Sequence, residues 1–338
     1  MKNKINIVYL NTLSIWKKFT PSWRRAGNEN MNLFEAELIK HKDVENFSLE
    51  TNMYLKNKGK WPVKFNQNFK NTIKIKEGSI IFVSALSPDM VEIAFGPIKH
   101  VKNQIRVLWL IDGWKTYWKD WLDLINIFKV DFIFCAYLEN VKWLEKSNMK
   151  AYWLPFAIEP ETNHCAFNKE YDIVQMGRII DGYHNKLQNS NFIYKTSSSF
   201  KKFLFLNKSL SYEEYCNVLS KSKYTLSYPS GYELDDKTRN DVLGFIPTNM
   251  RWYESMAAKS LPIGEIPSDD EFRKLFPNNK THIIESNIDT IIEDMSSISE
   301  NDRVKMINDN LKFILENHTY EKRVQTVIKQ ILRWTNDE

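Results

Sequence analysis

The runs IRVLWLI at residues 105–111 and VDFIFCA at residues 130–136 establish the fold class of the first half of the chain. Three similar apolar runs flank them, INIVYL (5–10), SIIFVSAL (79–86) and KAYWLPF (150–156), and amphipathic stretches such as 29–41 and 139–147 separate the runs. Short apolar runs that alternate with segments of helical length indicate βαβ units. We therefore predict a parallel sheet covered by helices.

A second series of the same kind follows a polar segment at residues 157–170, which contains Pro160 and has no periodicity. Its expected strands are 171–177, 203–206, 224–229, 261–265 and 281–286, and its expected helices are 185–197, 211–221, 249–259, 288–296 and 301–316. We therefore predict an α/β protein of two Rossmann-like domains facing a central cleft. The expected domains are residues 1–160 and 168–318, with a final helix at 319–338 packed back on the first domain.

Length and composition suit a two-domain globular protein of 338 residues, with 43% hydrophobic and 26% charged residues. The chain has no apolar run of about 18 residues that would span a membrane, and MKNKINIVYLNTL at its start resembles a first strand more than a signal peptide. Three widely spaced cysteines without a CxxC pair favour a reducing compartment. We expect a cytoplasmic monomer, inside a bacterial host if a phage encodes it, without a structural metal site.

The segment TNMRWYESMAAKSLPIGE (248–265) carries the clearest chemical signal. Thr248 or Asn249 can cap a helix, and Glu254 then lies in the first turns, where the helix dipole favours a carboxylate. Such a carboxylate is suited to accept both hydroxyls of a ribose. A structural carboxylate at a helix start is the alternative interpretation.

This segment resembles the R-[FYW]-E-x-[ML]-A-x-x-x-x-P signature of the second domain of GT-B glycosyltransferases. The resemblance implies the GT-B fold, a nucleotide-sugar donor, most simply a UDP-sugar, and donor-binding roles for Glu254 and Arg251. Many retaining members have an acidic residue eight positions before the glutamate, whereas this chain has Ile246 there. That difference argues against the retaining subtype and favours inversion.

A second donor-side segment is YDIVQMGRIIDGYHNK (171–186), a strand followed by a glycine-bearing turn and a helix. Gly177 permits close backbone approach, and free N–H groups at the helix start favour a diphosphate. Arg178, His184 and Lys186 add positive charge. A divalent cation is compatible with such a donor, but the sequence shows no set of protein ligands for one.

Asp112 follows the strongly apolar run 105–111, at the strand end where α/β enzymes place their chemistry. Burial there would raise its pKa and make it a better base toward an acceptor hydroxyl. The alternative is a turn-forming Asp112-Gly113 pair.

The three segments together resemble the DNA glucosyltransferases of bacteriophages. The resemblance implies that Asp112 is the general base, that Glu254 in the run Arg251–Ala257 binds ribose, and that Glu29, followed by Leu33 and Phe34, contacts the sugar. Two arginines of that family's diphosphate loop align with Ile180 and His184, so Arg178 and Lys186 would replace them. Residues 211–230 are also similar to bacterial CgeB-like glycosyltransferases, which leaves the acceptor open.

A basic, aromatic-rich N-terminal region supports a DNA acceptor. Residues 1–76 contain 15 Lys and Arg against 6 Asp and Glu. Positive side chains neutralise phosphates, and aromatic rings stack on an extruded base. The residues assigned to the acceptor are Lys17, Lys18, Trp23, Arg24, Arg25, Lys58, Lys60 and Trp114. A solvated lysine-rich face is the alternative.

The sequence therefore predicts a glycosyltransferase that moves a sugar from a nucleoside-diphosphate sugar to a hydroxymethyl-pyrimidine of double-stranded DNA. Two other functions remain open at this point. One is a transferase for bacterial surface polysaccharide or lipopolysaccharide, with a glycan acceptor. The other is a non-catalytic nucleic-acid-binding protein.

Overall fold

The computed structural model describes residues 6–11, 29–49, 54–55, 64–65, 75–160, 168–200, 210–267 and 270–336. The chain forms two compact units. Unit 1 comprises Met1–Pro155, Asn240–Phe245 and Arg323–Glu338, and unit 2 comprises Phe156–Arg239 and Ile246–Lys322. Within the described ranges, no helix combines the length and the apolar character needed to cross a membrane.

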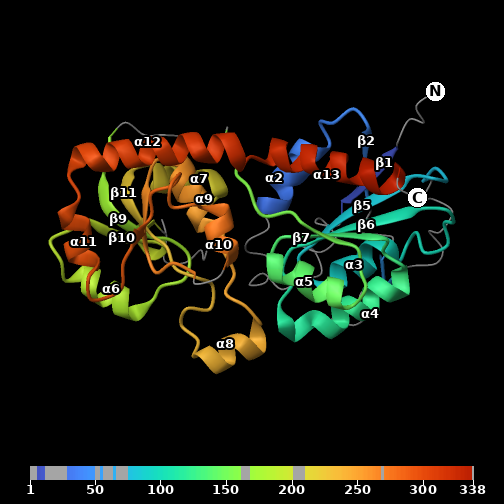
Figure 1. Cartoon of the computed structure of the whole chain (residues 1–338), viewed down its shortest axis with the longest axis horizontal. Helices are drawn as coiled ribbons and strands as arrows, with labels where there is room; N and C mark the ends of the chain where they lie inside the picture. The colour runs from blue at the N-terminus through green and yellow to red at the C-terminus, as the bar shows by residue number, and fades with distance from the viewer. Residues whose placement is uncertain are drawn as a thin grey trace. The chain divides into compact units, whose positions relative to one another are not determined.

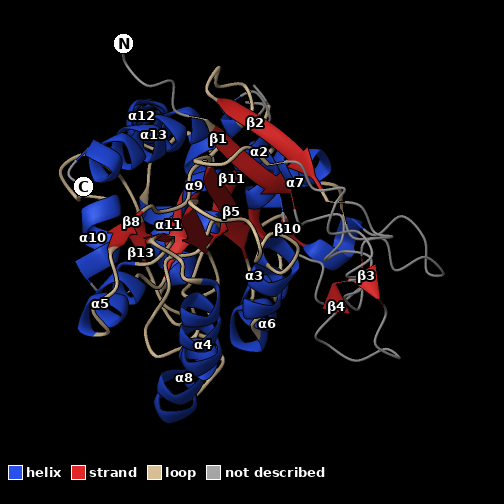
Figure 2. Cartoon of the chain, turned by 90° about the vertical axis from the view of Figure 1, so that its right-hand side faces the viewer, coloured by secondary structure: helices blue, strands red, loops and turns tan. Residues whose placement is uncertain are grey.

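Unit 1 is built on a six-stranded parallel sheet in the order β2-β1-β5-β6-β7-β8. Figure 2 shows β2, β1 and β5 side by side. The sheet strands are β1 Ile7–Asn11, β2 Val44–Ser48, β5 Ile80–Ala85, β6 Ile105–Leu110, β7 Phe132–Cys135 and β8 Ala151–Trp153. A separate antiparallel pair joins β3 Tyr54–Leu55 and β4 Lys64–Phe65. The helices are α2 Glu29–Leu38, α3 Pro88–Phe95, α4 Trp118–Phe128, α5 Leu138–Lys146 and α13 Tyr320–Asn336, with a 3₁₀ turn at Lys115–Tyr117.

Aromatic side chains fill one face of this sheet, because residues two apart along a strand point to the same side. Phe34 of α2 contacts Trp109 of β6 at 4.5 Å between ring centroids. Trp334 of α13 stacks on Phe132 of β7 at 4.3 Å and also contacts Phe134. The last helix of the chain therefore completes the core of unit 1, and α2 and α13 lie on this face in Figure 1.

Unit 2 contains a five-stranded parallel sheet in the order β10-β9-β11-β12-β13. Its strands are β9 Tyr171–Gln175, β10 Tyr194–Thr196, β11 Ser222–Leu226, β12 Leu261–Gly264 and β13 Ile284–Glu285. Its helices are α6 Asp181–Gln188, α7 Tyr212–Ser220, α8 Asp236–Val242, α9 Arg251–Ala257, α10 Asp270–Leu275, α11 Ile291–Ser297 and α12 Glu300–Asn317, with a 3₁₀ turn at Ser197–Phe200. Two of the divisions between the units fall inside helices, after Arg239 in α8 and after Lys322 in α13.

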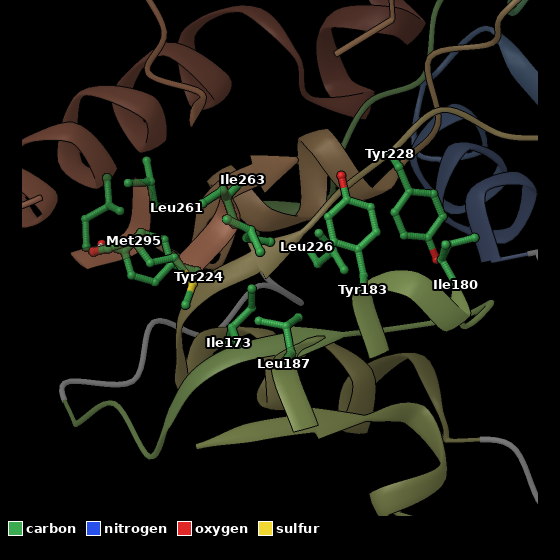
Figure 3. Packing of buried hydrophobic residues seen from close by; sticks show 12 residues of the cluster. Ile173, Ile180, Tyr183, Leu187, Tyr224, Leu226, Tyr228, Leu261, Ile263 and Met295 are labelled. Atoms are coloured by element: carbon green, nitrogen blue, oxygen red, sulfur yellow. Dashed lines mark hydrogen bonds between the residues drawn. The ribbon is translucent and has the colours of Figure 1, made fainter. Parts of the chain in front are cut away.

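The larger core of unit 2 lies between its sheet and the helices α6, α11 and α12 (Figure 3). Tyr183 and Leu187 of α6 meet Leu226 of β11 and Ile263 of β12 there, and all four are fully buried. A smaller cluster on the other face joins β9 to α7. Burial of this apolar area stabilises the unit by roughly 25 cal/mol per Å² removed from water.

One expectation about unit 2 is wrong, and another falls on residues outside the described ranges. The helix expected at 185–197 is wrong, because α6 spans Asp181–Gln188 and Tyr194–Thr196 form β10, paired with β9. The amphipathic pattern of residues 185–197 does not reveal the end of the helix at Gln188. The strand β10 that follows forms by pairing with β9, which is a contact between segments distant in the sequence. The strand expected at 203–206 lies outside the described residues.

The end of β12 allows no side chain, because Gly264 has φ +142° and a Cβ there would lie 2.0 Å from the carbonyl oxygen of Ser227. We predict that Gly264→Ala lowers the free energy of unfolding by about 2–5 kcal/mol, from backbone strain and overpacking together. Gly78→Ala is the control, since Gly78 also has positive φ, at +79°, but no atom lies within 4 Å of its would-be Cβ. Its cost should be about 1–2 kcal/mol. Thermal unfolding followed by circular dichroism measures both, and equal costs would contradict the steric argument.

Candidate functional site

The order of strands in unit 2 indicates where a ligand is expected to bind. From β9 the chain passes to β10 at one edge and then returns to β11 on the other side of β9. In open parallel sheets, ligands bind at the carboxyl ends of the two strands where the direction changes in this way. Gly177 follows β9, and Tyr228 follows β11.

Arg251 lies at this change of direction. Its guanidinium lies over the ring of Tyr228, 4.7 Å from the ring centroid. Gly177 has φ +85°, and a Cβ there would lie 3.2 Å from Nη2 of Arg251, so the glycine leaves room for the guanidinium. Within the described residues, the buried Nη1 of Arg251 has no hydrogen-bond partner. A cation with an unused, desolvated donor is suited to an anionic ligand.

Asn249 fixes the start of α9 to the end of β11. Its Oδ1 accepts a hydrogen bond of 3.1 Å from the backbone N–H of Arg251, and its Nδ2 donates one of 2.7 Å to the carbonyl of Tyr228. The expected cap at Thr248 or Asn249 is wrong, because Met250 is the N-cap of α9 and makes no side-chain cap hydrogen bond; Asn249, one residue earlier, bonds the N–H of Arg251 instead. These two bonds hold Arg251 at the carboxyl end of the sheet.

Glu254 lies one turn further along α9 and is only 6% exposed. The Tyr215 hydroxyl of α7 donates a 2.7 Å hydrogen bond to its Oε2. Burial raises the pKa of Glu254, whereas the hydrogen bond from Tyr215 and the charge of Arg251 act in the opposite direction. The structure therefore places Glu254 and Arg251 on one helix, with the carboxylate largely below the surface. Tyr215 was not predicted as its partner, although it lies in the segment 211–230.

The turn after β9 is held by side chains from three neighbouring segments. The Gly177 N–H donates to Oγ of Ser197 at 2.6 Å. Arg178 forms an ion pair with Glu233, and its carbonyl accepts a hydrogen bond from the Tyr228 hydroxyl. Arg178 thus follows the same strand as Gly177, but its guanidinium already has an anionic partner.

The other two predicted donor-side cations have separate surroundings. His184 Nδ1 lies 3.1 Å from the Tyr194 hydroxyl, which donates to Oε1 of buried Gln175 at 2.6 Å. Lys186 is exposed, and its Nζ donates to the carbonyl of Asp289 at 3.1 Å. The structure therefore links His184 to the end of β9 but gives Lys186 a contact next to α11.

Glu265 is an acidic residue at this sheet edge that the sequence analysis did not assign. It directly follows β12, and its Oε1 accepts hydrogen bonds from the hydroxyls of Tyr183, at 3.2 Å, and Tyr232. Burial and this carboxylate raise the pKa of Tyr232 to about 12. The position of Glu265 at the end of an expected strand was the feature of the sequence that could have indicated it as a site residue.

Asp112 follows β6 in unit 1 and is half-buried. Burial raises the pKa of its carboxyl to about 7. No hydrogen bond or ion pair from another described residue reaches this carboxyl group. A carboxylate that titrates near neutral pH and has no internal partner is suited to take a proton from a bound ligand.

The Gly113 carbonyl accepts hydrogen bonds from Nδ2 of Asn140, at 2.7 Å, and from Nε1 of Trp118, at 3.0 Å. A Cβ on Gly113 would lie 2.1 Å from Oδ1 of Asn140. Gly113 is not one of the described glycines with positive φ. The Asp-Gly pair is therefore not explained by a turn that needs a left-handed residue, since the glycine makes room for Asn140.

The remaining predicted residues are only partly described. Trp114 makes ring contacts with Tyr137 and Phe245. Glu29 begins α2, but its side chain lies outside the description. The following acceptor residues also lie outside the described ranges: Lys17, Lys18, Trp23, Arg24, Arg25, Lys58 and Lys60.

The described part of the chain contains no group of three or more His, Cys, Asp or Glu side chains that could hold a metal ion. Cys135 and Cys216 are buried free thiols, and burial raises the pKa of Cys216 to about 12. A thiol with such a pKa is a poor nucleophile at neutral pH. The polar side chains described near the strand ends of unit 2 include those of Arg251, Glu254 and Glu265.

Residues 194–329, about two-fifths of the chain, match the family model described as "Glycosyl transferase-like". The matched region contains Arg251, Glu254 and Glu265. Residues 194–329 therefore form a glycosyltransferase-like region. No curated protein sequence matches it significantly.

Solved structures similar to this chain share its two-unit α/β fold, which is the GT-B fold. A glycosyltransferase from Rickettsia africae is 11% identical, with a TM-score of 0.56 and coverage of 97% of each chain. S. aureus TarM in complex with fondaparinux, alpha-GlcNAc-glycerol and UDP is 12% identical, with a TM-score of 0.53 and coverage of 79% of this chain and 59% of TarM. This chain thus spans little more than half the length of TarM.

A trehalose-6-phosphate synthase studied for enzymatic glycosyltransfer with retention is 10% identical, with a TM-score of 0.52 and coverage of 77% of this chain and 74% of the synthase. The fold is therefore compatible with retention, and the fold alone does not establish the expected inversion. The resemblance to the phage enzymes stays a prediction.

The raised pKa of Asp112 predicts a pH-dependent stability difference. A carboxyl whose pKa is raised in the folded state destabilises the fold as it ionises, so its contribution falls from about pH 4 to about pH 7 and is constant above. Asp112→Asn should therefore have a Tm close to wild type near pH 4 and a progressively higher relative Tm up to about pH 7. Thermal unfolding at several pH values checks this, and a pH-independent difference would contradict the raised pKa.

Proposed function

We propose that the enzyme transfers a sugar from a nucleoside-diphosphate sugar to an acceptor hydroxyl. The observation that carries the proposal is Arg251, whose guanidinium lies over Tyr228 next to Gly177 at the change of strand direction in unit 2. Its buried Nη1 has no partner among described residues. A diphosphate supplies the negative charge and acceptor oxygens that this donor lacks.

The nucleoside part of the donor is assigned to Glu254. A carboxylate one turn from Arg251 can accept hydrogen bonds from ribose hydroxyls, and Tyr215 holds that carboxylate in place. The Glu254 side chain is largely covered, so the ribose would meet only its exposed edge. UDP is the preferred nucleotide, supported by its presence in the similar TarM structure.

Asp112 is the proposed general base. Its carboxylate takes the proton of the acceptor hydroxyl, whose oxygen forms a bond to the anomeric carbon while the bond from that carbon to the diphosphate oxygen breaks. The leaving diphosphate gains negative charge, which Arg251 stabilises. A direct displacement of this kind inverts the anomeric centre, and Ile246 in place of an acidic residue is consistent with it.

A hydroxymethyl-pyrimidine in double-stranded DNA is the proposed acceptor. The excess of 15 basic over 6 acidic residues in residues 1–76 supports a polyanionic partner. The second candidate is a glycan acceptor, favoured by the similarity to TarM, whose structure contains glycan ligands. Transfer assays with hydroxymethylated DNA and with oligosaccharides distinguish the two.

The division of roles between Arg251 and Asp112 is testable by comparing two variants. Arg251→Met removes the charge with little loss of length, and it should weaken UDP binding by roughly 10- to 100-fold, as expected for a charge-assisted hydrogen bond. Asp112→Asn should keep UDP affinity within about twofold and lower kcat for transfer by roughly 10²–10⁴, the usual contribution of a positioned base. Calorimetry with UDP and steady-state kinetics measure these effects.

Arg178→Met is the matched control for Arg251→Met, because the Arg178 guanidinium is already paired with Glu233. It should affect UDP affinity less than Arg251→Met does. Equal UDP affinity of wild type and Arg251→Met would refute the donor site. Near-normal turnover of Asp112→Asn would show that Asp112 is not the base.

The DNA acceptor predicts a salt-dependent affinity. Replacing Lys17, Lys18, Arg24 and Arg25 by Gln should weaken duplex binding and flatten the dependence of log Kd on log salt, because fewer counterions are released. Fluorescence anisotropy between about 50 and about 200 mM salt gives the slope. An unchanged slope would mean that these side chains form a solvated face.

A further inference from the structure

A hexapeptide from the second half of the chain belongs to unit 1. Residues Asn240–Phe245 are part of unit 1, although the chain on both sides of them belongs to unit 2. The backbone N–H of Lys115 donates to the carbonyl of Leu243 at 3.2 Å, and its Nζ donates to the carbonyl of Asn240 at 3.2 Å. Gly244 has φ +81°, and a Cβ there would lie 2.8 Å from Cβ of Lys115. The hexapeptide is therefore closely fitted to the segment that follows β6.

The hexapeptide adds a ring to an aromatic cluster of Trp114, Tyr137 and Phe245. Ring centroids are 5.4 Å apart for Trp114 and Tyr137, 5.9 Å for Trp114 and Phe245, and 5.1 Å for Tyr137 and Phe245. Tyr137 is buried, whereas Trp114 and Phe245 are half-buried. The cluster thus has one buried ring, that of Tyr137, and two rings that keep accessible surface.

The cluster lies beside the proposed base. Trp114 is two residues after Asp112, so their Cα atoms are at most about 7 Å apart. Both side chains are half-buried and keep accessible surface. A molecule that brings a hydroxyl to Asp112 would therefore be close to the rings of Trp114 and Phe245.

We propose that Trp114 and Phe245 form the stacking subsite for the acceptor, and that the acceptor ring is a nucleobase. This inference rests on the proposed function of Asp112. The two rings offer apolar faces, and the polar groups of Lys115 next to them are engaged by backbone carbonyls. A pyrimidine stacks on such rings through its planar face, and the choice of a nucleobase over a sugar ring rests on the proposed DNA acceptor.

The subsite also assigns a role to the hexapeptide. Phe245 is only nine residues before Glu254 in the chain, so one short segment supplies a residue to the acceptor subsite and leads into the donor-binding helix. Phe245 is then a specificity-determining residue rather than part of the core alone. Its loss should change acceptor affinity and leave donor chemistry intact.

The test compares Phe245→Leu and Trp114→Leu with Phe245→Tyr, which keeps a ring. Tyr117→Leu is the matched control, because Tyr117 is an exposed aromatic residue, 40% accessible, three positions after Trp114. Acceptor Kd is measured by anisotropy with an oligonucleotide that contains hydroxymethylcytosine, without donor. Hydrolysis of the nucleotide sugar, without acceptor, reports separately on the donor site and the fold.

Both ring-removing variants should weaken oligonucleotide binding by roughly 5- to 100-fold, the range of one lost base-stacking contact. Phe245→Tyr and Tyr117→Leu should stay within about twofold of wild type, and all variants should hydrolyse the nucleotide sugar at the wild-type rate. Unchanged oligonucleotide affinity of Phe245→Leu and Trp114→Leu, with wild-type hydrolysis, would overturn the subsite.

The failure of the proposed function gives a different result. A wild-type enzyme that neither binds nor hydrolyses any nucleotide sugar refutes the glycosyl donor itself. A wild type that hydrolyses the donor but transfers the sugar only to oligosaccharides refutes the nucleobase as the ligand of these rings.

Discussion

Parallel pairing of the strands is the constraint on which the rest of the structure depends. Because every strand in a parallel sheet runs the same way, all its carboxyl ends meet at one edge, and side chains far apart in the sequence become neighbours there. In unit 2 this brings Gly177 and Tyr228 to one edge. Asn249 then anchors α9 to the same edge through two hydrogen bonds, which places Arg251 over Tyr228. In unit 1 the same constraint leaves Asp112 at the end of β6.

The two proposed acidic groups show how burial is balanced differently at the two sites. Glu254 is nearly covered, but a tyrosine hydroxyl and an arginine offset the cost of burying its charge. Asp112 has only burial acting on it, so its pKa moves to the neutral range. The first arrangement suits a group that stays in one state and binds. The second suits a group that gains and loses a proton in each cycle.

The sequence was sufficient for features that depend on local pattern. Apolar runs predicted β1, β5 to β7, β9, β11 and β12, and one segment predicted the helix that carries Glu254. Features that depend on distant partners were missed. Tyr194–Thr196 lies inside an amphipathic pattern, and nothing local to Phe245 indicates that it belongs to unit 1. The need for a glycine at position 113 was missed for a similar reason, because the atom that requires it belongs to Asn140, 27 residues away.

The interleaving of the two units has a consequence for how the protein comes into being on the ribosome. Unit 1 begins with the first strand but needs Phe245 and then Trp334 of the final helix to cover its rings. While unit 2 is being synthesised, the aromatic face of Phe132 and Phe134 lacks its last cover. Unit 1 can thus complete its core only after Trp334 has left the ribosome, whereas unit 2 can fold once Lys322 has left it. The unit that starts first would then complete its core last, and a cut between Pro155 and Phe156 would yield an incomplete first unit rather than two independent domains.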